Sequence, residues 1–343
     1  GLPLAFRLFH GSENEQPSLK PLEEKILRDF NLSQFVVCTD AGLSSHENRL
    51  FNNEGERAFV MTQSIKKLKA FLRDWALDPK GWKLKQSNKL YDLSEIDVTT
   101  QEERNNIYYK SRWIKENGLE QQLIVTFSPK YKEYCQTVRE RQVDRAKEKI
   151  ANPSSMKAKQ ANDPARFVKR YTVTEDGELA KKDVYSLNEE AIAQEARYDG
   201  FYAVCTNLED DPLSIIAVNK GRWEIEATFR IMKSELKARP VYLKRDDRIQ
   251  AHFLTCFIAL LIYRILVKKI RLRLPEDTPS GEAIVKTLCE MDFLEKESDG
   301  YIPVYTRTDI TDALHDEFGF RTDLELLPKR EMKKIVKMTK QGK

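Results

Sequence analysis

The sequence predicts an α/β fold, and three observations lead to this prediction. Residues 35–39 form a short apolar run that reads as a buried strand, and residues 57–62 form a second one. The segment between them, 45–53, reads as a helix. Residues 221–236 carry apolar side chains at helical spacing, which indicates an amphipathic helix. Alternation of strands and helices is typical of α/β proteins.

The first predicted strand ends at an acidic residue, in the order Asp40-Ala41-Gly42. A carboxylate at the carboxyl end of a strand, beside a glycine that lets a ligand approach, is a usual place for a metal-binding aspartate. An aspartate that caps a turn or a helix fits these residues equally well.

The helix predicted at 221–236 carries two stripes of side chains. Charged residues at i, i+4, i+8 and i+11 form a polar stripe: Arg222, Glu226, Arg230 and Lys233. Apolar residues form the neighbouring stripe: Ile225, Phe229, Met232 and Leu236. We therefore expect Glu226 to lie beside the core. The alternative is an ordinary amphipathic helix whose i,i+4 ion pairs contribute a few tenths of a kcal/mol each.

The interval between the second strand and residue 198 is too long for a loop. It contains strand-like runs at 106–109 and 122–127, and a basic helical segment at about 130–150. Lysine and arginine there can contact nucleic-acid phosphates, but interleaved acidic residues make a solvated helix an equal alternative. Residues 157–164 read as a linker.

The last third of the chain is predicted to be helical. The apolar run from Phe253 to Tyr263 is shorter than the roughly 20 residues of a membrane span, so we expect a buried helix at about 248–270. Further helices are expected from 278 to 288 and from 309 to 318. A basic segment follows at 329–340, which either contacts DNA or stays without fixed structure.

Composition limits the classes of function. The chain has 343 residues, which suggests about two domains, and a net charge of +4, which excludes a histone-like polycation. Its five cysteines are odd in number and scattered, so they indicate an intracellular protein without a disulfide framework or a zinc site. A phosphate-cradling glycine loop and a Ser-His-Asp pattern are absent from the sequence.

Three motifs resemble those of bacterial insertion-sequence DDE transposases. Arg222, Glu226 and Lys233 match the R-x3-E-x6-K part of the signature Y-x2-R-x3-E-x6-K, whereas Asn219 stands where its tyrosine is expected. The strand that ends in Asp40 is similar to the strand that carries the second catalytic aspartate of that family. Residues 199–207, which begin Asp199-Gly200, resemble the D-G-x5-T-N strand that precedes the glutamate helix.

The resemblance implies a ribonuclease-H-like core interrupted by a β-rich and helical insertion domain, with a helical C-terminal appendage. It divides the chain into a first part of the core (1–62), the insertion domain (63–197), a second part of the core with the glutamate helix (198–272), and a helical region with a basic tail (273–343). Residues 1–11 resemble the family's returning strand. We therefore expect the core to be incomplete at its N-terminus, with the first catalytic aspartate absent.

The resemblance also implies a chemistry. Asp40 and Glu226 would bind two Mg²⁺ or Mn²⁺ ions, and Arg222 and Lys233 would contact DNA phosphates. The reaction would be cleavage at transposon ends and strand transfer into target DNA. The protein would act as a homodimer on double-stranded DNA. It would be located in the bacterial cytoplasm, associated with the nucleoid and not with a membrane. Asp199 is an alternative third carboxylate, although it precedes its strand whereas Asp40 follows one. The alternative function is a catalytically dead DNA-binding remnant of such a transposase.

Overall fold

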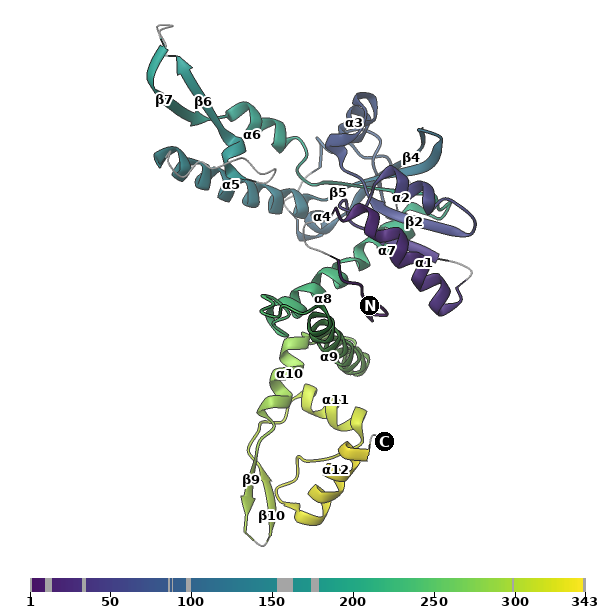
Figure 1. Ribbon diagram of the computed structural model, residues 1–343, viewed down its shortest axis with the longest axis vertical. Coiled ribbons are helices and arrows are strands. Elements are labelled where there is room, and N and C mark those ends of the chain that lie inside the picture. The colour runs from purple at the N-terminus through teal and green to yellow at the C-terminus, as the bar shows by residue number, and fades with distance from the viewer. Residues whose placement is uncertain are drawn as a thin grey trace. The chain divides into compact units, whose positions relative to one another are not determined.

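The computed structural model describes residues 2–9, 14–32, 35–85, 87, 89–96, 100–152, 163–173, 179–297 and 299–341. The chain divides into two compact units. The first unit consists of residues 9–222, and the second consists of residues 1–8 and 223–343 (Figure 1).

A six-stranded mixed sheet forms the centre of the first unit. Its order is β1 (Phe35–Thr39), β2 (Arg57–Thr62), β8 (Phe201–Thr206), β5 (Leu119–Phe127), β4 (Tyr108–Glu116) and β3 (Lys83–Leu84). β1 and β2 are parallel, and the remaining pairs are antiparallel. The predicted α/β class is confirmed, and the two predicted strands have the predicted ends.

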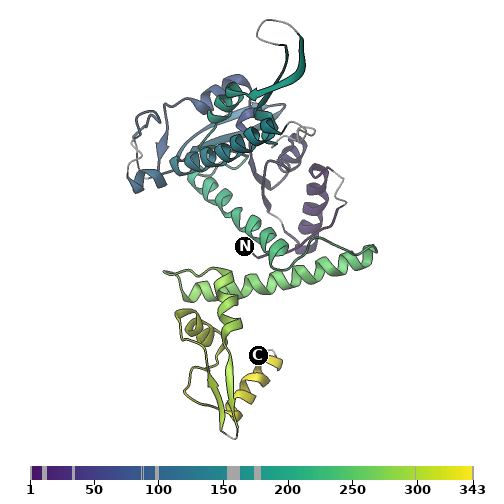
Figure 2. The same ribbon diagram turned by 90° about the vertical axis from the view of Figure 1, so that its left-hand side faces the viewer.

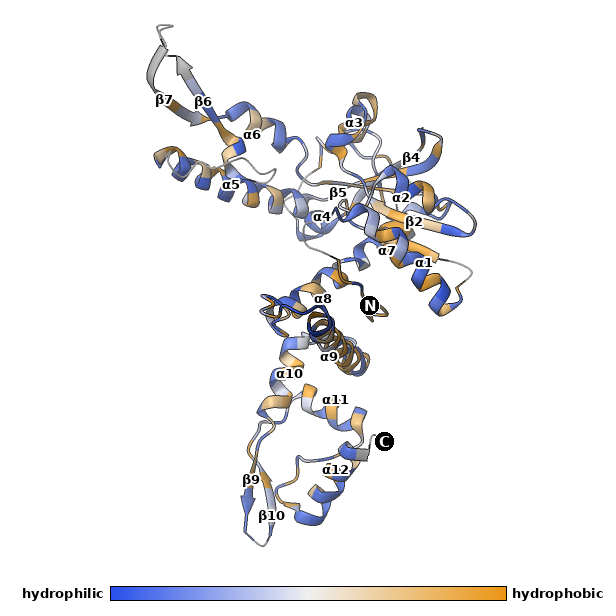
Figure 3. Cartoon of the chain, viewed as in Figure 1, coloured by the Kyte–Doolittle hydropathy of each residue, from blue (hydrophilic) through white to orange (hydrophobic). Residues whose placement is uncertain are grey.

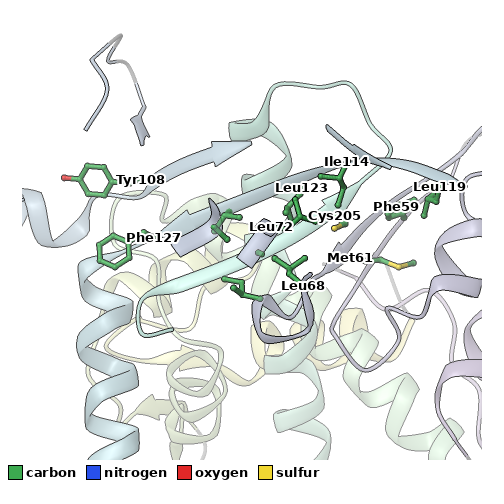
Figure 4. Packing of buried hydrophobic residues seen from close by; sticks show 14 of the residues in the cluster. Phe59, Met61, Leu68, Leu72, Tyr108, Ile114, Leu119, Leu123, Phe127 and Cys205 are labelled. Carbon is green, nitrogen blue, oxygen red and sulfur yellow. The ribbon is translucent and has the colours of Figure 1, made fainter. Parts of the chain in front are cut away.

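Both faces of this sheet are covered, because side chains alternate along each strand. On one face, Met61, Leu123 and Cys205 pack with residues of α3 (Ala70–Leu77) and η2 (Ile65–Lys67). Figure 4 shows this cluster, and Figure 3 shows the apolar character of the strands. On the other face, Val60, Ile124 and Val204 pack against Ile215 and Ile216 of α7 (Pro212–Gly221).

The other elements of the first unit precede or follow these strands. They are η1 (Gln16–Ser18), α1 (Leu19–Phe30), α2 (His46–Phe51), α4 (Gln101–Asn105), α5 (Pro129–Ala151), η4 (Pro164–Phe167), the hairpin β6 (Val168–Val173) and β7 (Leu179–Leu187), and α6 (Glu189–Ala196). α5 is the predicted basic helix. Of the predicted linker 157–164, residues 157–162 lie outside the described residues, and Pro164 begins η4.

The strands predicted for the insertion domain join the main sheet. β4 and β5 form a hairpin, and β5 pairs with β8, which in turn pairs with β2. Residues 63–197 therefore contribute half of the strands of this sheet, and the four-part division of the chain stays a prediction.

The second unit contains helices and a small sheet. Its helices are α8 (Trp223–Ser234), α9 (Asp246–Arg273), α10 (Gly281–Glu290), α11 (Asp309–Phe318) and α12 (Lys329–Gln341), of which Figure 2 shows α9 along its length. The strands β9 (Phe293–Lys296), β10 (Gly300–Pro303) and β11 (Leu327–Pro328) form a three-stranded sheet. The C-terminal region was expected to be helical, and it contains the helices α10, α11 and α12 together with this sheet. Gly300 explains the close packing there, because a Cβ at this position would lie 2.3 Å from the carbonyl oxygen of Leu327.

Two predictions for the second unit need correction. Residues 2–9 form no strand, and no described strand pairs with them; instead the Phe6 ring packs on Phe257 of α9 with a centroid distance of 4.9 Å. α9 is buried on one face only, since Leu260 is 1% exposed whereas Ile262 is 62% exposed. Among the described residues, no helix combines the length and the apolarity that a membrane crossing requires.

Candidate active site

Asp40 directly follows β1, where Thr39 is in register with Met61 of the parallel strand β2. Its Oδ1 accepts hydrogen bonds from the backbone N–H groups of Gly42 (2.9 Å) and Leu43 (3.3 Å). A Cβ at residue 42 would lie 3.1 Å from this oxygen, so the glycine leaves room for the carboxylate. The Asp40 side chain thus caps a turn, and its Oδ2 makes no hydrogen bond within the described part of the chain. A carboxylate has about four lone-pair positions, so this oxygen remains able to bind a cation.

The loop after Asp40 is held by several side chains. Ser45 Oγ accepts a hydrogen bond from the backbone N–H of Asn48 (3.1 Å), which caps α2. Asn48 donates to the Leu43 carbonyl (2.9 Å), and buried Arg49 donates to Ser44 Oγ (2.6 Å). These bonds hold the loop whose Gly42 and Leu43 N–H groups donate to Asp40.

Arg222 follows α7 and reaches the ends of the same two strands. Its Nη2 donates to the hydroxyl of Tyr202 on β8 (3.2 Å), which lies 2.6 Å from Thr62 Oγ1 at the end of β2. Thr62 Oγ1 in turn donates to the Thr39 carbonyl (3.4 Å), next to Asp40. Tyr202 and Thr62 cannot be recognised from the sequence alone, because their roles depend on strand pairing and not on a motif.

Tyr202 and Asn219 line one cavity of about 290 Å³. Asn219 is the residue that stands in place of the signature tyrosine. Tyr131 also lines this cavity, and burial raises the pKa of its hydroxyl to about 12. A phenol, that of Tyr202, is therefore present at the same cavity as residue 219, but it comes from strand β8 and not from helix α7, which carries Asn219.

Asp199 has a partner of its own. Its carboxylate forms a buried ion pair with Arg139 of α5, and the two side chains are 8% and 14% exposed. Strand direction does not separate Asp199 from Asp40, because β8 is antiparallel to β2 and begins at the edge where β1 and β2 end. What separates them is the arginine that already neutralises Asp199.

Glu226 and Lys233 lie on α8, in the second unit. The neighbouring Glu224 pairs with Arg264 of α9 (2.8 Å). Residues two positions apart in a helix are about 200° apart around its axis, so Glu226 lies on the side of α8 away from this contact. Glu226 is exposed, and α8 has no buried residue, so the expectation that Glu226 lies beside the core was wrong.

The predicted polar stripe does not belong to one helix. α7 ends at Gly221, Arg222 is its C-cap, and α8 begins at Trp223. Asp40 and Arg222 consequently belong to the first unit, and Glu226 and Lys233 to the second.

The donor groups suit a hard cation. Asp40 and Glu226 offer carboxylate oxygens, the ligands that Mg²⁺ and Mn²⁺ prefer. Cys38 precedes Asp40 by two residues, and burial raises the pKa of its thiol despite the charge of nearby Arg222. A protonated thiol does not compete for such a metal.

A different group of possible ligands occurs in the second unit, at Asp312, His315 and Asp323. Arg307 pairs with Asp312 (2.8 Å) and Arg321 with Asp323 (3.1 Å). Two arginines already neutralise the two carboxylates, so we assign no metal to this group.

Residues 127–262 match the family model of the transposase DDE domain. This match supports a DDE transposase. The matched segment contains Asp199, Arg222, Glu226 and Lys233, and it does not include Asp40. The family acts on DNA and generally uses divalent metal ions. No curated protein matches the chain.

Proposed function

We propose that the chain is the catalytic part of an insertion-sequence transposase with a ribonuclease-H-like core. It would cut DNA at the ends of the element by metal-dependent hydrolysis and join the freed 3′-hydroxyl to target DNA. The observation that carries this proposal is the family match over residues 127–262, within which Arg222, Glu226 and Lys233 have the signature spacing. Asp40, at the carboxyl end of a strand in a parallel pair, supports it.

Each residue has a role in this proposal. Asp40 and Glu226 would hold two divalent metal ions, which when bound would polarise the phosphodiester and activate the attacking oxygen. Arg222 offers a planar fork of N–H donors that matches the geometry of a phosphate. Lys233 adds a flexible point charge for the DNA backbone. The protein would act as a homodimer that holds two DNA ends.

The test is cleavage of supercoiled plasmid DNA by the purified chain with Mg²⁺, Mn²⁺ or EDTA. We expect nicking that requires the metal and falls more than about 100-fold in Asp40→Asn and in Glu226→Gln, since each change removes a charged ligand. Glu209→Gln and Asp210→Asn are matched controls, because both residues are exposed in the loop before α7. These controls should cleave like the wild type.

Two results would contradict the proposal. One is cleavage that persists in EDTA, and the other is equal activity of the wild type and both site variants. DNA binding without any cleavage would instead support a catalytically dead DNA-binding remnant.

A further inference from the structure

We propose that Tyr202 is a positioning residue that holds the Arg222 guanidinium at the carboxyl ends of β1 and β2. Its hydroxyl would take the place of the phenol that the transposase signature has at residue 219. The catalytic meaning of this inference rests on the proposed function.

The direction of the hydrogen bonds from Arg222 to β1 is fixed by chemistry. Arginine can only donate, and a backbone carbonyl can only accept. Arg222 Nη2 therefore donates to Tyr202 Oη, and Thr62 Oγ1 donates to the Thr39 carbonyl. This leaves the Tyr202 hydroxyl proton for Thr62 Oγ1, at 2.6 Å. Each hydroxyl then donates once and accepts once, and successive bonds of this kind polarise one another.

Strand register explains why Tyr202 can reach this place. Val204 is paired with Thr62, the last residue of β2, so Tyr202 lies two residues beyond that pair. Its side chain is on the same face as that of Val204, the face that α7 covers. Arg222 directly follows α7, so the ring of Tyr202 lies between the end of β2 and the end of α7.

The hydroxyl contributes position rather than bulk. In Tyr202→Phe the ring still lines the cavity shared with Asn219, but Arg222 Nη2 loses this acceptor and Thr62 loses its donor. The Arg222 guanidinium is then held less firmly at Tyr202 and the end of β2. The expected effect is on the geometry of catalysis, with the fold retained.

Tyr109→Phe is the matched control. Tyr109 belongs to the same apolar cluster as Tyr202, and its hydroxyl makes no hydrogen bond within the described residues. Plasmid cleavage should show a kcat about 10- to 100-fold lower in Tyr202→Phe, the range seen when a residue that orients a catalytic group is removed. KM should change little, and Tyr109→Phe should match the wild type.

A second measurement does not depend on activity. The urea midpoint of unfolding is compared for the wild type, Tyr202→Phe, Arg222→Gln and the double variant. Tyr202→Phe should lower the midpoint more when Arg222 is present than when residue 222 is glutamine, because the bond to Thr62 is lost in both backgrounds and the bond to Arg222 in only one. Equal shifts in both backgrounds would show that Tyr202 does not hold Arg222 and would overturn the inference.

The two measurements separate this inference from the proposed function. If the wild type cleaves DNA and Tyr202→Phe cleaves equally well, the function stands and the positioning role is wrong. If the wild type does not cleave with either metal, the proposed function fails, and with it the catalytic role of Tyr202. The midpoints then still decide whether the hydroxyl holds Arg222.

Discussion

The buried ion pair between Arg139 and Asp199 should be essential for the stability of the first unit. Arg139→Met removes the cation and leaves the Asp199 carboxylate at a position where only 8% of its side chain is exposed. Solvent cannot replace the lost partner there. Breaking a buried ion pair in this way lowers the free energy of unfolding by about 3–5 kcal/mol, and we expect a decrease of this size for Arg139→Met.

The reverse change and the double change test the same ion pair. Asp199→Asn should lower the free energy of unfolding by about 3 kcal/mol, the lower end of that range. The Arg139 side chain that it leaves unpaired is 14% exposed, so water can partly solvate it. The double variant buries no unpaired charge. Its loss should be smaller than the sum of the single losses by about 1–3 kcal/mol.

Urea unfolding followed by tryptophan fluorescence measures these changes. Three of the four tryptophans, Trp75, Trp82 and Trp113, lie in the first unit, so a Trp223→Phe background reports on that unit alone. Arg145→Met, a change at an exposed residue of the same helix, is the control and should stay within about 0.5 kcal/mol. Two results would refute a stabilising role for this ion pair. One is a decrease in the free energy of unfolding below about 1 kcal/mol in Arg139→Met, and the other is a double variant whose decrease equals the sum of the two single decreases. Loss of metal-dependent cleavage in Asp199→Asn without a loss of stability would instead make Asp199 a metal ligand.

Three further predictions concern stability. Gly200→Ala should lower the free energy of unfolding, measured in urea, by about 2–4 kcal/mol, because φ is +83° and the new Cβ would lie 2.8 Å from Lys132 Cβ and from the Phe127 ring. Gly55→Ala is the control and should lower it less, because residue 55 has φ +64° but no atom close to the new Cβ. Burial lowers the pKa of Lys110 from 10.5 to about 8, so the unfolded chain binds more protons than the folded chain between these two pH values. The urea midpoint of the wild type, measured relative to that of Lys110→Met, should therefore rise with pH across this range. Burial also lowers the pKa of His315 below 6.5, so acid should favour the unfolded form. As the pH is reduced below about 6.5, the melting temperature of the wild type should decrease. A plot of melting temperature against pH that runs parallel to the plot for His315→Gln would contradict this.

Local patterns in the sequence were sufficient to predict β1, β2 and the position of Asp40. Short apolar runs bounded by turn residues define a strand without knowledge of its neighbours. α5 and α11 were predicted for a similar reason, since helical periodicity and end signals lie within the helix itself. Arg222, Glu226 and Lys233 came from a motif whose spacing is also local.

The contacts that organise the site are not local. Tyr202 and Thr62 are separated by 140 residues, and Arg139 and Asp199 by 60. Strand alternation places Tyr202 on the same face as Val204, but only the pairing of β8 with β2 shows that this face meets α7 and Arg222. Spacing alone also predicted one helix through residue 222, whereas the chain changes from α7 to α8 at that point.

The central position of β8 affects how this sheet forms during synthesis. β1 and β2 follow each other closely, and β4 and β5 form a hairpin, so each group can form early from nearby residues. β8 joins the two groups, but it is synthesised 79 residues after β5 ends, counted from residue 127 to residue 206. At about 5–20 residues per second this takes roughly 4–16 s. During that time the facing edges of β2 and β5 lack their partner and can pair with other chains, so we expect aggregation of the nascent protein to start at these edges.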